Sequence, residues 1–148
     1  IRSQIERATP GKVEKLRETL ENIHDVETRQ ERRDVRLGEL TPTQGKVYAD
    51  ELEGRRYELE RGLAEPVVVI DTGTELLLAD GHHRVKAASR LAIDEMDAYV
   101  IVIDEPVDLG MVKTAEKEQL ESIDDIDAVD YAHHPLVETT ERLQQHNS

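Results

Sequence analysis

A buried strand that runs directly into a helix, within residues 75–91, constrains the fold of this chain more than any other segment. The stretch Glu75–Ala79 is almost wholly aliphatic, which is typical of a buried strand. Asp80 then stands where a helix begins and is a plausible N-cap. The inward face of that helix is expected to consist of Arg84, Val85, Ala88 and Leu91. A strand, a tight turn and a helix in this order predict an α/β (α+β) domain.

The turn between them, Gly81-His82-His83-Arg84, has the chemistry of an anion site. The first N–H groups of a helix have no partner inside the helix and lie at the positive end of its dipole. Gly81 lets an anion come close, and the planar guanidinium of Arg84 suits phosphate or carboxylate. The turn is therefore predicted to bind phosphate. The alternative is a capped helix whose Arg84 makes a structural salt bridge.

Three polar side chains of this junction are candidates for chemistry. Asp80 is expected to serve as N-cap, to orient a substrate hydroxyl or Mg²⁺, or to do both. His82 and His83 diverge by about 100° on a helix, so at most one faces a reacting group. We favour His83 as the catalytic one, with His82 donating to a phosphate or a backbone carbonyl. Zinc binding by these two with His133 and His134 is a weaker alternative, because cysteine is absent and neither pair has i, i+4 spacing.

The junction and its surroundings resemble the ParB/sulfiredoxin superfamily, whose members hold nucleotide phosphates in a G-x-x-R turn at the start of a helix. The similarity includes the loop 40–44, the strands 66–70 and 99–103 and the turn 71–74, so it covers roughly residues 35–103. It implies a small mixed sheet with flanking helices. The D-G-H-H-R spelling is most similar to ADP-dependent free serine kinases and ParB-like nuclease domains. Sulfiredoxin chemistry is excluded because the chain has no cysteine.

Gln44 leaves the choice between these two branches open. The serine kinases carry a glutamate, thought to act as base, in a loop that corresponds to Thr41-Pro42-Thr43-Gln44. An amide does not accept a proton near neutral pH, so either Glu51 or another carboxylate replaces it or the kinase reaction is absent. ParB proteins often have glutamine in this loop. Gln44 is therefore expected to contact substrate or simply to close a turn.

Other patterns complete the expected core. A short strand is expected from Val35 to Leu40, followed by a helix near residues 45–62. Arg55 and Arg56 on this helix are either a solvated face or lie beside the site. The aliphatic runs within residues 67–79 predict a hairpin.

An amphipathic helix is expected before the core. Thr9 and Pro10 suit its N-cap and first helical position. Four aliphatic residues then recur at helical spacing: Val13, Leu16, Leu20 and Ile23. This stripe is predicted to pack against the core or against a second subunit, which would make a homodimer. Residues 25–34 are almost all polar and predict a solvated helix end or a linker.

Beyond residue 103, short helices are expected, with starts marked by Ser122 with Asp125 three positions later, and by Pro135. The Tyr131–Pro135 segment is expected to be a surface turn or to help close the pocket. The chain is thus divided into an N-terminal helical segment (1–34), a core domain (35–103) and a C-terminal helical extension (104–148).

Charge narrows the setting of the protein. The 148 residues include 33 acidic and 19 basic ones, a net charge of −14, which is typical of a salt-adapted, halophilic cytoplasmic protein. Such a charge disfavours DNA as a partner. No apolar run approaches the ~20 residues that cross a membrane, and no charged-then-apolar leader is present, so a soluble, unexported protein is expected. The missing initiator methionine suggests processing or a fragment.

Together, the junction and the resemblance predict a nucleotide-binding protein. The Gly81–Arg84 turn would hold the phosphates of a nucleoside di- or triphosphate (ADP, ATP or CTP), with Mg²⁺ bridging and no metal site made of side chains alone. The expected reaction is phosphoryl transfer to a small hydroxyl metabolite, or nucleotide hydrolysis, with electrostatic clamping supplying most of the rate enhancement. The alternative is a ParB-like regulatory module without enzymatic activity, which couples nucleotide binding to dimerisation or DNA association.

Overall fold

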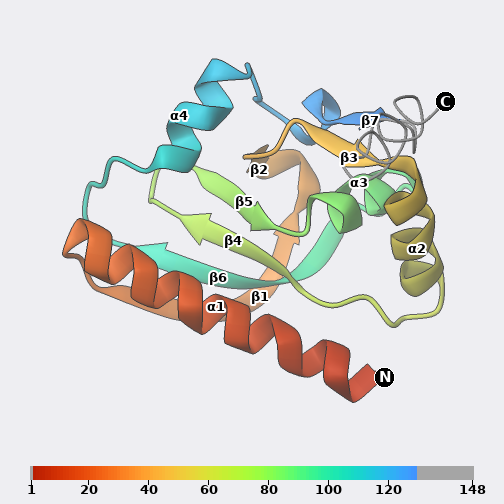
Figure 1. Cartoon of the computed structure of the whole chain (residues 1–148), viewed down its shortest axis with the longest axis horizontal. Helices are drawn as coiled ribbons and strands as arrows, with labels where there is room; N and C mark the ends of the chain where they lie inside the picture. The colour runs from red at the N-terminus through yellow and green to blue at the C-terminus, as the bar shows by residue number, and fades with distance from the viewer. Residues whose placement is uncertain (1, 130–148) are drawn as a thin grey trace, which may run out of the picture.

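The computed structural model describes residues 2–129, in which helices pack around a mixed sheet (Figure 1). The α-helices are α1 (Arg2–His24), α2 (Ala49–Glu60), α3 (His82–Arg90) and α4 (Gly110–Lys117). The strands are β1 (Thr28–Arg36), β2 (Leu40–Pro42), β3 (Lys46–Tyr48), β4 (Val67–Asp71), β5 (Leu76–Asp80), β6 (Glu95–Ile103) and β7 (Asp127–Val129). Two 3-10 helices, η1 (Leu37–Glu39) and η2 (Ile123–Asp125), connect them. The predicted α+β class is confirmed.

Strand β4 lies at the centre of a five-stranded sheet whose order is β1-β6-β4-β5-β2. It pairs in parallel with β6 and antiparallel with β5, so the hairpin expected within residues 67–79 is present. At the edges, β1 pairs antiparallel with β6 and β2 pairs in parallel with β5. Strands β3 and β7 form a separate two-stranded sheet. The main sheet is therefore small and mixed, as predicted.

Helices cover both faces of the sheet, so alternate residues of β4 enter two different cores. Val67 and Val69 point into a core shared with α2 and α3. Val68 and Ile70 point into a second core, shared with α1 and the segment that starts α4. All four side chains are at most 1% exposed. Double coverage explains why this strand is a continuous aliphatic run.

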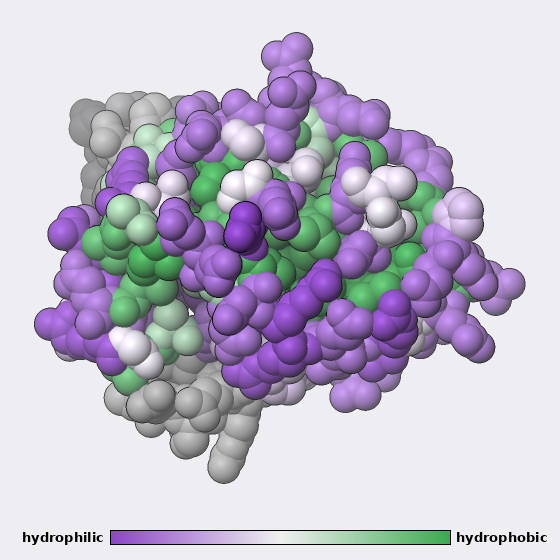
Figure 2. Space-filling view, turned by 180° about the vertical axis from the view of Figure 1, so that it is seen from behind, coloured by the Kyte–Doolittle hydropathy of each residue, from purple (hydrophilic) through white to green (hydrophobic). Residues whose placement is uncertain are grey.

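Polar residues dominate the outside of the molecule. Figure 2 shows the face behind the view of Figure 1, where hydrophilic residues form most of the outline and hydrophobic residues lie between them in patches. Ile23 and Tyr57 are the exposed large hydrophobic residues within the described range. None of the helices in residues 2–129 combines the length and hydrophobicity that crossing a lipid bilayer requires.

The interpretation of residues 25–34 as a solvated helix end or a linker is wrong. Residues 28–36 form the nine-residue edge strand β1, which pairs with β6 along its whole length. The strand shows no apolar alternation although its register partners on β6 are mostly apolar, because its exposed arginines pair with nearby carboxylates. Arg32 Nη2, for example, lies 2.6 Å from Asp97 Oδ2. Charged side chains of this kind also protect an edge strand from unwanted pairing.

Helix α1 begins at Arg2 and contains Pro10, so the expected start at Thr9 is wrong. Packing of its stripe on the sheet is confirmed for Val13 and Leu20, which are 0% and 5% exposed, and Leu16 packs at the margin of the same core. Ile23 is 71% exposed and lies outside the stripe. Since each residue turns a helix by about 100°, Ile23 points about 80° away from Val13.

Two further boundaries differ from expectation. The strand expected at Val35–Leu40 is divided, because β1 ends at Arg36 and η1 turns the chain into β2. The helix expected near residues 45–62 is the shorter α2, and its first expected residues form β3.

The helix start expected at Ser122 is present. Ser122 and Asp125 form a complete capping box at the start of η2. Ala92 takes a left-handed conformation (φ 59°) just after α3, where a glycine usually ends a helix. Pro135 and the Tyr131–Pro135 segment lie outside the described residues, as do His133 and His134 of the zinc alternative.

Candidate functional site

The junction predicted from the sequence is present, with one change in its helix cap. Strand β5 ends at Asp80 and leads into α3 (Figure 1). The N-cap of α3 is Gly81, and no side chain caps the helix, so the prediction of Asp80 as N-cap is wrong. The first helical bond is donated by Val85 N–H to the Gly81 carbonyl at 2.9 Å. The N–H groups of His82, His83 and Arg84 therefore have no acceptor inside the helix.

Gly81 is required at this position for two reasons. Its φ of 105° lies in the left-handed region, where side chains are strained. A Cβ on Gly81 would also lie 2.6 Å from Val67 Cγ1 of the neighbouring strand. The absence of a side chain brings the start of α3 directly against β4. The same absence places no side chain of residue 81 over the first helical N–H groups.

A cavity of about 200 Å³ lies at this turn. It is lined by Lys12, Gln44, Glu51, Arg55, Ala79, Asp80, Gly81, His82, His83 and Arg84. The structure therefore brings every predicted site residue to one cavity. It also places there Glu51, which is the alternative to Gln44 as base, and Arg55. Arg56 pairs instead with Glu60 on the exposed side of α2, which matches the interpretation as a solvated face.

Both histidines use Nε2 to accept a backbone N–H. His82 Nε2 accepts from Thr43 N–H at 3.0 Å, and His83 Nε2 accepts from Tyr48 N–H at 3.1 Å. In a neutral imidazole the other ring nitrogen then carries the proton, so each ring presents Nδ1–H as a donor. The two rings thereby fasten the segment between β2 and α2 to the start of α3.

Burial keeps these rings neutral. His82 is 4% exposed, and desolvation lowers its pKa to about 4. Burial also lowers the pKa of His83, and nearby Glu51 opposes this shift. Glu51 Oε2 lies 3.3 Å from His83 Nε2. A neutral imidazole beside a carboxylate is an arrangement suited to positioning a hydroxyl or water.

The positive charge of Arg84 is partly neutralised by a buried carboxylate, Glu65. Its Nη2 lies 3.3 Å from Glu65 Oε2, and each of the two side chains is 9% exposed. Glu65 Oε1 accepts a hydrogen bond from Thr9 Oγ1 of α1 at 2.5 Å. The alternative interpretation of Arg84, a structural salt bridge, is therefore confirmed. Phosphate binding by the same side chain stays a prediction.

Asp80 lines the cavity and forms an ion pair with Lys12 of α1. Lys12 Nζ lies 3.8 Å from Asp80 Oδ2, which is an ion pair too long for a hydrogen bond. Within the described residues, this buried oxygen has no hydrogen-bond partner. A carboxylate oxygen without a donor is poised to accept one from a ligand or to contact a cation.

Gln44 lies on the exposed rim of the cavity. Its Nε2 donates to the carbonyl of Lys46 at 2.5 Å, which closes the loop between β2 and β3. This is the simpler of the two roles expected for Gln44. Its predicted contact with substrate is untested.

Sequence reasoning missed three residues of the site: Thr9, Lys12 and Glu65. Thr9 was interpreted as a helix cap, and Lys12 is one charge among many on α1. Glu65 stands before Pro66 at the entry to β4, and the available signal was a lone carboxylate in an otherwise apolar approach to a strand.

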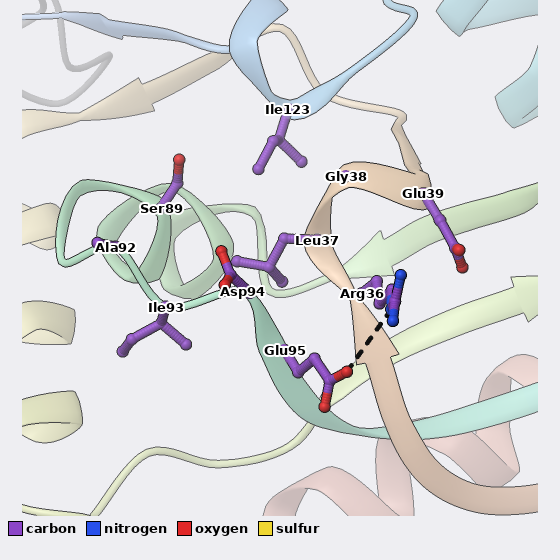
Figure 3. Close-up of a pocket in the computed structure, with 10 residues that line it drawn as sticks. All are labelled: Arg36, Leu37, Gly38, Glu39, Ser89, Ala92, Ile93, Asp94, Glu95 and Ile123. Carbon is purple, nitrogen blue, oxygen red and sulfur yellow. Dashed lines mark ion pairs between the residues drawn. The ribbon is translucent and has the colours of Figure 1, made fainter.

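A larger hollow of about 870 Å³ lies at the other end of α3, around its last turn (Figure 3). Its charged residues are mostly acidic: Glu39, Asp94 and Glu95. Its arginine, Arg36, pairs with Glu95 at 3.7 Å. Among the described residues that line this hollow there is no start of an α-helix, and Arg36 is the one cationic side chain, so the smaller cavity is the better candidate. Among the residues that the structure describes, no three His, Cys, Asp or Glu side chains come together as a metal site.

Comparison with known proteins shows which proteins this chain is similar to, but those similarities do not assign a function. No family model matches the chain. The uncharacterized protein MJ0188 of Methanocaldococcus jannaschii is 46% identical over 132 residues, which are 88% of this chain and 49% of that protein. The chain thus spans about half the length of this relative. The crystal structure of protein Atu1540 from Agrobacterium tumefaciens matches with a TM-score of 0.52 and 18% identity, over 68% of this chain and 63% of that one, which shows a shared fold.

Proposed function

We propose that this chain binds the phosphates of a nucleoside di- or triphosphate at the start of α3. The observation that carries the proposal is the left-handed Gly81, after which three helical N–H groups have no acceptor in the helix, at a cavity lined by three cationic side chains and two carboxylates. Uncovered N–H groups and the helix dipole both favour an anion. Resemblance of the same turn to the ParB/sulfiredoxin superfamily points to nucleotide phosphates in particular.

The size of the cavity limits which part of a nucleotide it would enclose. Pockets that bury a whole drug-sized ligand usually measure ~300–1,000 Å³. At about 200 Å³, this cavity is smaller and suits a phosphate chain. The nucleoside would then lie outside, against the surface formed by α2 and the β2–β3 loop.

Charge determines what must accompany the phosphates. Each cation that lines the cavity already has a carboxylate partner: Lys12 with Asp80, Arg55 with Glu58, and Arg84 with Glu65. A polyphosphate would therefore meet a nearly neutral site. A divalent cation would remove this obstacle, and the Oδ2 of Asp80, which accepts no hydrogen bond within the described residues, fits Mg²⁺ bound by one carboxylate and by phosphate oxygens. Bound there, Mg²⁺ would supply charge that stabilises phosphoryl transfer.

For the reaction we propose phosphoryl transfer to a small hydroxyl metabolite or to water. Glu51 is the proposed base, because it lies beside His83 in the cavity, and glutamine at position 44 cannot accept a proton. His83, held through Nε2, would orient the hydroxyl with its Nδ1–H. Asp80 would orient the phosphates through the cation. We place this reaction in the cytoplasm, where nucleotides are supplied.

A ligand screen tests the binding proposal. ADP, ATP, CTP and GTP would each be added with and without Mg²⁺, at high salt, while the melting temperature is followed. A nucleotide at 100 times its Kd stabilises a protein by about 2.7 kcal/mol, which is readily visible. No shift with any nucleotide under either condition would refute the proposal.

A pair of variants tests the proposed base by the release of phosphate from the nucleotide. Glu51→Gln is expected to slow this release. Glu53→Gln is the matched control, because Glu53 lies two positions further along α2, on a different face of the helix.

The regulatory alternative makes a different prediction for the same protein. Gln44 closes its own loop instead of facing a hydroxyl, and this favours binding without catalysis. In that case nucleotide would bind and persist unchanged, while sedimentation would show a nucleotide-dependent dimer. DNA association is the weaker form of this alternative, because a net charge of −14 opposes it.

A further inference from the structure

Helix α1 reaches the start of α3 with two side chains, Thr9 and Lys12. The two lie three positions apart and therefore on neighbouring parts of one helix face. Val13, beside Lys12, is 0% exposed in the core beneath α1. The helix is thus fixed to the sheet at the point where these two residues project.

Thr9 belongs to a buried chain of contacts that ends on Arg84. Its hydroxyl donates to Glu65 Oε1 at 2.5 Å, and Glu65 Oε2 lies 3.3 Å from Arg84 Nη2. Thr9 is 1% exposed, Glu65 9% and Arg84 7%. Arg84 Nη1 also donates to the Pro66 carbonyl at 3.5 Å, and Nε has no hydrogen-bond partner among the described residues, so Glu65 is the carboxylate that holds the guanidinium. Thr9 in turn fixes that carboxylate.

Lys12 lines the same cavity as the first residues of α3, His82 to Arg84, whose N–H groups have no acceptor in the helix. Its ammonium lies 3.8 Å from Asp80, and its side chain is 56% exposed, so it retains freedom to move. Asp80 immediately precedes Gly81. A lysine on a flexible stem is a common point charge for phosphate, and it can shift from a carboxylate to a phosphate oxygen without a backbone change.

We propose that α1 forms part of the ligand site, with Lys12 binding the phosphate that α3 holds and Thr9 positioning Arg84 through Glu65. This inference rests on the proposed function, since it needs a phosphate at the start of α3. It places two binding determinants outside residues 35–103, to which the family resemblance extends.

The first test compares two lysines of α1. Lys12→Ala and Lys15→Ala remove the same charge from the same helix, but Lys15 is exposed and does not line the cavity. Titration with Mg²⁺–ADP and with inorganic pyrophosphate is expected to show a five-fold or larger loss of affinity for Lys12→Ala and less than two-fold for Lys15→Ala. The salt dependence of binding should also become shallower in Lys12→Ala alone. Equal effects of the two variants would overturn the role of Lys12.

The second test separates positioning from general stability. Thr9→Val keeps the shape of the side chain and removes the hydroxyl, whereas Thr9→Ser keeps the hydroxyl. Measured well below each melting temperature, affinity for Mg²⁺–ADP should fall in Thr9→Val and be retained in Thr9→Ser. In a Glu65→Ala background, Thr9→Val should cause no further loss, because the carboxylate through which it acts is gone. If Glu65→Ala does not fold, the comparison of Thr9→Ser with Thr9→Val decides the matter.

The outcomes distinguish this inference from the proposed function. Wild-type protein that binds Mg²⁺–ADP, together with unchanged affinity in Thr9→Val and Lys12→Ala, would overturn the role of α1 and leave the phosphate site intact. Wild-type protein that binds neither Mg²⁺–ADP nor pyrophosphate would overturn both.

Discussion

Glu65 Oε2 lies 3.3 Å from Arg84 Nη2, with both side chains removed from solvent between the start of α3 and helix α1. A buried pair of this kind contributes little net stability, yet breaking it is costly because one charge is left without a partner. Arg84 therefore has a structural role, in addition to the proposed role in binding a ligand. Loss of binding in an Arg84 variant must be measured alongside its stability.

Arg84→Ala is accordingly expected to lower the free energy of unfolding by about 3–5 kcal/mol, because it strands the Glu65 carboxylate in the core. Arg32→Ala is the matched control, since Arg32 also pairs with a carboxylate, Asp97, but on the exposed sheet edge. An exposed pair contributes about 0–1 kcal/mol. Urea unfolding of the two variants and the wild type measures both values. Equal losses in the two variants would contradict the importance of burial.

Gly81→Ala tests the left-handed turn. A side chain there carries the left-handed strain of about 1–2 kcal/mol and, in addition, overpacking of about 1–3 kcal/mol against Val67. Gly73 provides a matched control, because its φ is also positive (90°) but a Cβ there would meet nothing within 4 Å. Gly73→Ala should show the strain alone. A difference between the variants in thermal unfolding measures the clash, and no difference would show that Val67 moves away freely.

Much of the region around the site was predictable, because local rules act there without competition. The aliphatic run of β5, the glycine after it and the apolar period of α3 together specify a strand, a turn and a helix. The capping box of Ser122 and Asp125 is equally local and was predicted correctly. Patterns of this sort follow from backbone geometry within a few residues.

The remaining features depend on contacts between distant segments. Strand β1 could not be recognised in the sequence. Arg32 and the residues beside it pair with residues of β6 that lie more than sixty positions away along the chain. Glu65 and Thr9 are 56 positions apart, and each looks unremarkable until the fold brings them together. Tertiary pairing also moved the cap of α3 from Asp80 to Gly81, since Asp80 is used as the last residue of β5.

The apolar stripe of α1 yields a third prediction. Leu20 is 5% exposed in the core under α1, whereas Ile23, one turn later, is 71% exposed. Leu20→Ala should therefore cost about 2–5 kcal/mol in the free energy of unfolding. Ile23→Ala is the control on the same helix and should stay within about 0.5 kcal/mol. A loss for Ile23→Ala as large as that for Leu20→Ala would indicate that Ile23 is covered in solution, as a second subunit would cover it.

His82 makes the stability of the protein depend on pH. Burial lowers its pKa to about 4 in the folded state, from about 6.5 in the unfolded chain, so the unfolded chain binds more protons between these values. Stability from the neutral ring is thus complete above about pH 6.5 and is lost as the pH falls towards 4, by about 3 kcal/mol at ~1.4 kcal/mol per pKa unit. His82→Gln, which can still accept the N–H of Thr43, should reduce the slope of this part of the profile in urea unfolding at pH 4–7, and the slope that remains is expected from His83, whose pKa burial also lowers. A His82→Gln profile parallel to that of the wild type would contradict the assignment.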